Sequence, residues 1–89
     1  MTEKISPRLA EIVEALPLRP GMRVLEIGCG PGVAARAVLQ RIGKGHVLAI
    51  DRSVKAISQA VAGSAVELAS GRLEFRCVAV ENFVLSKGE

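Results

Sequence analysis

Residues 24–32, with the sequence VLEIGCGPG, limit what this chain can fold into more than any other stretch. An apolar run, broken only by Glu26, leads directly into three alternating glycines, Gly28, Gly30 and Gly32. Glycine adopts positive φ angles at little cost and lets a ligand approach the backbone closely. If a helix follows, its N-terminal N–H groups border the same pocket. The stretch therefore predicts a buried strand, a glycine loop and a helix arranged around a ligand.

The remaining apolar segments alternate between helical and strand patterns. Helices are expected over residues 5–16 and 33–42, from a cap at Ser53, and over residues 65–69; strands are expected over residues 23–27, 46–51 and 72–80. This alternation predicts a parallel sheet with right-handed crossovers and the strand order 3-2-1. Because the strands are apolar on both faces, helices are expected on each side of the sheet, which gives an α/β fold of three layers.

Composition narrows the possible partners. The length of 89 residues allows one domain, and 49% hydrophobic residues exclude a disordered chain. With two Phe and no Trp or Tyr, the chain lacks the aromatic side chains that stack on single-stranded nucleic acid. The net charge of +3 comes from Lys and Arg residues that form no run, so they are expected on the solvated surface. These features argue against a nucleic-acid partner.

Cysteine usage and hydropathy point to the cytoplasm. Cys29 and Cys77 do not make a disulfide framework, and Cys77 is expected in the core. There is no recognisable signal peptide, and no apolar run approaches the ~20 residues of a membrane-spanning helix, so no membrane partner is expected. His46 has no second His or Cys at metal-ligand spacing, so no metal is predicted.

Asp51 identifies the class of ligand. It ends the second expected strand, and in a doubly wound sheet ligands bind outside the carboxyl ends of the strands. A carboxylate there accepts hydrogen bonds from both hydroxyls of a ribose. The sequence therefore predicts a cofactor that contains a nucleoside.

The glycine spacing argues against a dinucleotide. The dinucleotide fingerprint places its third glycine five residues after the first, where this chain has Val33. Glu26 would also repel a pyrophosphate, whereas it suits a ligand with a cationic amino acid end. A nicotinamide dehydrogenase is therefore disfavoured.

Residues 24–32 closely resemble the first motif of the class I S-adenosylmethionine-dependent methyltransferases, and Asp51 resembles the acidic residue of their second. The resemblance implies a Rossmann-like fold and S-adenosyl-L-methionine as cofactor. It implies that Gly28, Gly30 and Gly32 form the loop around the methionine and ribose, and that Cys29 belongs to the same cofactor-binding loop. The small side chain of Cys29 is itself expected to pack inward. Glu26 would orient the methionine end.

The same resemblance assigns the adenosine side of the pocket. Asp51 would bind the ribose hydroxyls, Arg52 would lie against the adenine, and Glu81 would line its edge. The family often has an acidic residue near the end of the third strand, and this chain has Ala79 there. Glu81 is two positions further on and reads equally well as a solvated residue at the start of a helix.

The resemblance covers almost the whole chain but only the front part of the family's seven-stranded domain. Residues 1–89 thus read as an incomplete, N-terminal cofactor-binding part, and the first strand would be left as a sheet edge, which tends to recruit another strand. The chain is then expected to be a fragment or truncation, a homodimer formed through that edge, or a poorly stable remnant.

Two classes of function remain. The first is a methyltransferase that passes a methyl group from the sulfonium to an unidentified acceptor. The second is a non-catalytic cofactor-binding or interaction module that keeps the loop and lacks an acceptor site. Methyl transfer needs mainly the positioning of two reactants, so no general base is assigned.

Overall fold

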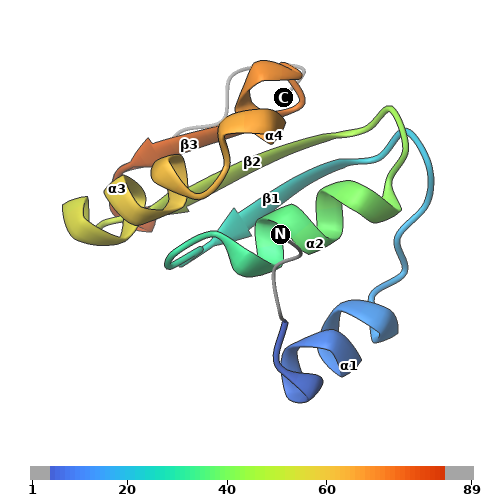
Figure 1. Cartoon of the computed structure of the whole chain (residues 1–89). Helices are drawn as coiled ribbons and strands as arrows, with labels where there is room; N and C mark the ends of the chain where they lie inside the picture. The colour runs from blue at the N-terminus through green and yellow to red at the C-terminus, as the bar shows by residue number, and fades with distance from the viewer. Residues whose placement is uncertain (1–4, 84–89) are drawn as a thin grey trace.

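Residues 5–83 are described by the computed structural model, which alternates helices and strands along the chain (Figure 1). The helices and strands have the types that the sequence pattern predicts, with bounds that differ by a few residues, whereas the 3₁₀ turn was not predicted. The elements are α1 (Pro7–Ala15), β1 (Arg23–Ile27), α2 (Val33–Arg41), β2 (His46–Asp51), α3 (Val54–Ala62), α4 (Ala65–Ala69), β3 (Leu73–Cys77) and a 3₁₀ turn (Val80–Asn82). No helix among these residues is both long and apolar enough to span a membrane.

The three strands form one parallel sheet in the order β1-β2-β3. This is the expected order 3-2-1 read from the other edge, so the sheet prediction is confirmed. Leu25 pairs with Leu48, which pairs in turn with Glu74. Each crossover contains a helix, and the carboxyl ends of all three strands lie at the same end of the sheet.

The two faces of the sheet have different surroundings. Helices α2, α3 and α4 lie over one face (Figure 1), where Val47, Ala49 and Leu73 are buried in the main core. On the other face, Leu25 is 37% exposed and Ile27 is 57% exposed. Residues 5–83 therefore build two of the three expected layers, and β1 is not buried on both faces as its composition suggested.

Local sequence signals explain where the helices begin. The Ser6 hydroxyl accepts a hydrogen bond from the Leu9 amide at 3.2 Å, with Pro7 at the first helical position of α1. The Ser53 hydroxyl accepts from the Ala56 amide at 3.1 Å at the start of α3. Gly43, just after α2, has a φ of 56°, as expected of a residue that ends a helix.

Helix α1 packs on α2 rather than on the sheet. Its residue Val13 is 2% exposed and joins the core. Arg41 of α2 makes an ion pair with Glu14 at 2.6 Å, but both side chains are largely exposed, so this pair contributes little stability. The apolar residues of α1 recur at helical spacing, as Leu9 and Val13 do, but they are only partly covered, since Ile12 remains 51% exposed.

The third strand is shorter than its apolar pattern predicted. The Val78 amide donates to the Asp51 carbonyl at 3.0 Å, and β2 ends at Asp51. Without a strand beside it, the chain turns: the Asn82 amide donates to the Ala79 carbonyl at 2.9 Å. Cys77, expected in the core, is exposed because it is the last residue of this short strand.

Candidate functional site

A cavity of about 240 Å³ lies at the carboxyl ends of the three strands. This is the place where a doubly wound sheet binds its ligand. The structure brings four of the predicted residues to it, from three different segments of the chain. Its lining residues are Ile27, Gly28, Ile50, Asp51, Arg52, Val78, Ala79, Val80 and Glu81.

The glycine loop is tied to the end of β2 by backbone hydrogen bonds. The amides of Gly28 and Cys29 both donate to the Ile50 carbonyl, at 2.8 and 3.0 Å. Gly28 and Gly30 have φ values of 75° and 54°, and a Cβ built on either would meet no atom within 4 Å. The loop therefore presents open space along its outer side, where only glycine adopts this backbone without strain.

Asp51 connects the loop with the start of α3. One carboxylate oxygen accepts from the Gly30 amide at 2.9 Å and the other accepts from the Ser53 amide at 2.9 Å. Hydrogen bonds from the Ser53 and Gly30 amides lower the pKa of Asp51, so the side chain is ionised at neutral pH. Each carboxylate oxygen keeps a further lone pair, so Asp51 can also accept from a ligand.

Glu26 lies inward of the loop on the face of the sheet that the helices cover. Its Oε1 atom is buried and, within residues 5–83, has no hydrogen-bond partner. Burial raises the pKa of Glu26 to about 7. A buried carboxylate oxygen without a donor is costly, and a ligand with an ammonium group would remove that cost.

Gly32 differs from the other two glycines because its surroundings are closed. A Cβ at this position would lie 2.9 Å from Nη1 of Arg36 and 3.2 Å from side-chain atoms of both Ala60 and Phe75. Its φ of 89° also requires glycine. Gly32 therefore allows α2 to begin close against α3 and β3, and it faces protein rather than the open side of the loop.

Cys29 packs inward, as expected, and is 6% exposed. Burial, and then the nearby charges of Glu26 and Asp51, raise the pKa of the Cys29 thiol to about 11. A thiol in this state is a poor nucleophile. In the described part of the chain, no three His, Cys, Asp or Glu side chains gather where they could hold a metal ion.

Sequence reasoning missed Arg36, which it left among the solvated surface charges. Arg36 is 7% exposed, and its guanidinium donates to the Pro31 carbonyl of the glycine loop at 3.2 Å. The available signal was its position on α2: Arg36 is four residues after Gly32 and three before Leu39, which are both buried.

The parallel sheet, its helices and the cavity at the carboxyl ends of the strands together define a Rossmann-like domain. The chain belongs to the methyltransferase-domain family, because the family described as "Methyltransferase domain" matches residues 24–89. The expected resemblance to S-adenosylmethionine-dependent methyltransferases is thereby confirmed.

Individual relatives extend the match. Ribosomal RNA small subunit methyltransferase H of Methylococcus capsulatus is 35% identical over 82 residues, which cover 90% of this chain and 27% of that protein. Protein-L-isoaspartate O-methyltransferase 1 of Rhodopseudomonas palustris is 43% identical over 68 residues, which cover 76% of this chain and 26% of that protein. Across the curated relatives that it matches, the chain spans between 16% and 27% of their length.

A solved structure shows the same arrangement. The S-adenosylmethionine-dependent methyltransferase of Thiobacillus denitrificans, in complex with S-adenosyl-L-homocysteine, superposes with a TM-score of 0.73 at 27% identity. The superposition covers 91% of this chain and 33% of that one. The three-stranded sheet and its helices are therefore one part of a larger domain in that protein.

The loop glycines differ in what they contact, which gives a first prediction. Gly30→Ala should lower the free energy of unfolding by ~1–2 kcal/mol, because alanine is strained at positive φ. Gly32→Ala should suffer the same strain and lower the free energy of unfolding by about 1–3 kcal/mol more, because its Cβ overlaps packed neighbours. Urea denaturation of both variants measures the difference. Equal losses would show that the contacts of Gly32 are unimportant.

Glu26 should make stability depend on pH. Its pKa of about 7 in the folded chain lies above the ordinary 4.5, so the stabilisation is complete below pH 4.5 and is lost as the pH rises through about 7. We expect a loss on the order of 1–2 kcal/mol, allowing for partial solvent screening. Glu26→Gln should remove this loss.

Urea unfolding at about pH 5 and about pH 8 measures the effect. Glu11→Gln, which changes an exposed residue of α1, is the matched control and should keep the wild-type pH dependence. If Glu26→Gln and the wild-type chain lose stability equally between the two conditions, Glu26 is not protonated in the folded chain.

Proposed function

We propose that residues 1–89 form the N-terminal, cofactor-binding part of an S-adenosylmethionine-dependent methyltransferase. The observation that carries this proposal is the buried Oε1 atom of Glu26, which lacks a donor among the described residues, behind a loop that is open at Gly28 and Gly30. Asp51 lines the 240 Å³ cavity, whereas Glu26 is not among its lining residues and lies behind the loop beside it. An unsatisfied carboxylate behind the loop, together with a carboxylate in the cavity that could bind a ribose, fits this cofactor. Family membership and the S-adenosylhomocysteine complex of a relative support it.

In this proposal, Glu26 and the glycine loop hold the amino acid end of the cofactor. The Glu26 carboxylate would accept a hydrogen bond from the ammonium group, directly or through water. The absence of side chains at Gly28 and Gly30 would let the cofactor lie against the backbone. Gly32 and Cys29 would support the loop from behind, since both are buried against protein.

The adenosine end would lie in the 240 Å³ cavity. Asp51 would accept hydrogen bonds from the ribose hydroxyls while it keeps the Gly30 amide in place. Arg52, which follows β2, and Glu81, in the 3₁₀ turn after β3, line the same cavity, so they would border the adenine. Ala79 also lines it, but it offers no side-chain acceptor for the adenine amino group.

The cofactor supplies a methyl group already activated on a sulfonium, so this part of the protein has to bind and orient it. The two relatives named above are named for different acceptors, a ribosomal RNA and a protein isoaspartate. We therefore place acceptor choice outside these residues. The alternative is a module that binds the cofactor without turnover, and acceptor-dependent formation of S-adenosylhomocysteine would exclude it.

Calorimetric titration with S-adenosylmethionine is the central test. Saturable binding by the wild-type chain is expected. Asp51→Asn should weaken binding by ~1–3 kcal/mol, because an amide cannot accept from Gly30, Ser53 and the ribose at once. Gly30→Val should abolish binding by filling the open space above the loop.

Glu74→Gln is the matched control, since it neutralises an exposed carboxylate on β3 that is not among the residues lining the cavity. It should bind like the wild-type chain. Unchanged affinity in Asp51→Asn would show that the ribose is held elsewhere. Tight binding of NADH in place of S-adenosylmethionine would instead support the hypothesis of a nicotinamide dehydrogenase.

The open edge of β1 supports a second proposal, a homodimer formed by edge pairing. Among the described residues, β1 has a neighbour on one side only. Leu25 and Ile27 add exposed apolar surface beside that edge.

We also infer a cytoplasmic location from the two free thiols, Cys29 and Cys77. Fractionation of cells that express the chain tests this location.

If β1 pairs with β1 of a second copy, sedimentation analysis of the full chain should give twice the monomer mass. Ile27→Lys should shift it to a monomer, because a charge beside the edge disfavours pairing. Ile12→Lys is the matched control: Ile12 is 51% exposed, close to the 57% of Ile27, but it lies on α1. A wild-type chain that stays monomeric would contradict the dimer.

A further inference from the structure

Arg36 is a buried cation in the middle of the helical layer. It is 7% exposed, and Nη1 donates to the Ser64 hydroxyl at 2.7 Å and to the Pro31 carbonyl at 3.2 Å. Ser64 is itself 0% exposed and lies between α3 and α4. Buried charges are retained only where polar contacts compensate for the lost hydration, and these two contacts contribute to that compensation.

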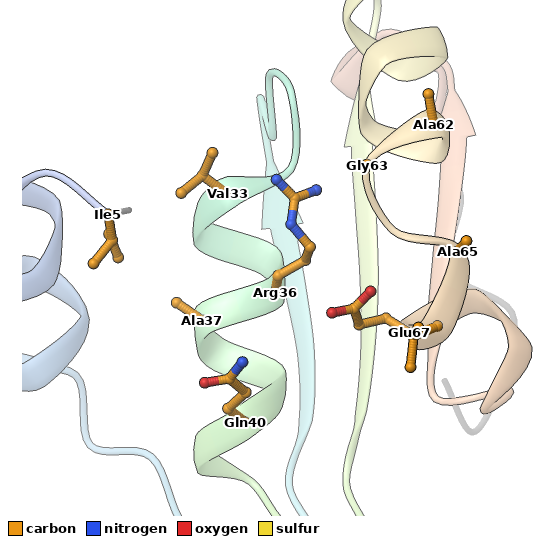
Figure 2. A pocket seen from close by; sticks show the side chains of 10 residues that line it. Ile5, Val33, Arg36, Ala37, Gln40, Ala62, Gly63, Ala65 and Glu67 are labelled. Atoms are coloured by element: carbon orange, nitrogen blue, oxygen red, sulfur yellow. The ribbon is translucent and has the colours of Figure 1, made fainter. Parts of the chain in front are cut away.

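Two glycines leave the room that the guanidinium occupies. A Cβ at Gly32 would lie 2.9 Å from Nη1, and a Cβ at Gly63 would lie 3.3 Å from the same atom. Gly63 has a φ of −88°, which any residue adopts, so space rather than backbone conformation explains a glycine there. Figure 2 shows the side chain rising from α2 toward the level of Gly63.

The two acceptors belong to distant segments. Pro31 is part of the glycine loop, between Gly30 and Gly32, and Ser64 follows α3. The hydrogen bonds of Gly28, Cys29 and Gly30 tie the loop to the end of β2. Arg36 ties the same loop to the helical layer from the other side.

We propose that Arg36 is a positioning residue of the cofactor site, which fixes the glycine loop through the Pro31 carbonyl and is itself anchored on Ser64. The inference rests on the function proposed above. Pro31 is flanked by two residues with positive φ, so rotation about them would move the loop unless its carbonyl were held. Arg36 does not line the 240 Å³ cavity, so it acts through the loop and not on the cofactor itself.

A cavity of about 650 Å³ beside Arg36 determines which substitution is informative. Val33, Gln40 and Glu67 line it together with Arg36 (Figure 2). A short side chain at position 36 would enlarge this space and destabilise the chain for reasons unrelated to the loop. Arg36→Met keeps most of the length and removes the hydrogen bonds to Pro31 and Ser64, whereas Ser64→Ala removes only the bond to Ser64.

The first readout is amide hydrogen exchange at Gly30 and Gly32, measured by NMR on the ligand-free full chain. Their amides donate to Asp51 and to the Cys29 carbonyl. Arg36→Met should raise both exchange rates about tenfold relative to the amide of Ala49 in β2, and Ser64→Ala should raise them less. Arg41→Met, an exposed arginine of the same helix, should leave them unchanged.

The second readout is calorimetric affinity for S-adenosylmethionine, at a temperature where each variant is folded. Arg36→Met should bind about tenfold more weakly, and Arg36→Lys, which keeps the charge and one bond, should fall in between.

Two results would overturn the inference: loop exchange at the wild-type rate in Arg36→Met, or wild-type affinity despite faster exchange. If Arg36→Met does not fold, Ser64→Ala decides by the same criteria. If the wild-type chain binds no cofactor, the proposed function fails, while the exchange rates still show whether Arg36 holds the loop.

Discussion

The attachment of the glycine loop to the end of β2 is the interaction on which the site depends. One carbonyl, that of Ile50, accepts two loop amides, and the next residue, Asp51, accepts a third through its side chain. These bonds fix a loop that contains three residues with positive φ and would otherwise have many accessible conformations. Because β2 is the central strand, the loop takes its position from the most buried part of the sheet.

The sequence predicted what depends on neighbouring residues. The structure confirms the expected cap at Ser53, and Ser6 and Gly43 likewise mark helix ends through features within a few residues. The predicted end of β3 was wrong because the true end depends on where β2 stops. The apolar pattern of β3 itself holds no information about that position. Arg36 was missed for a similar reason, since its partner Ser64 is 28 residues away. The cofactor-binding roles assigned to the loop residues, Glu26, Asp51, Arg52 and Glu81 all stay predictions, although the structure places Asp51, Arg52 and Glu81 at one cavity.

The sheet face opposite the helices shows why composition alone overestimates burial. Leu25 and Ile27 are as apolar as Leu48 and Ile50, with which they pair, yet only the residues of β2 are buried. A central strand is shielded by its two neighbours, whereas an edge strand depends on a covering layer. At ~25 cal/mol per Å², covering such side chains would contribute substantially to stability, so this face favours association with further protein.

Glu26 links the stability of the fold to the proposed function. A glutamine there would avoid the cost of a buried charge, so a carboxylate at this position is consistent with the charged partner that the proposed function supplies. Within residues 5–83 no donor reaches its Oε1 atom, while the neighbouring backbone is kept open by glycines. The unsatisfied group and the open space lie at the same end of the sheet. A ligand that brings its own positive charge resolves both features at once, which neither a purely structural carboxylate nor a pyrophosphate ligand does.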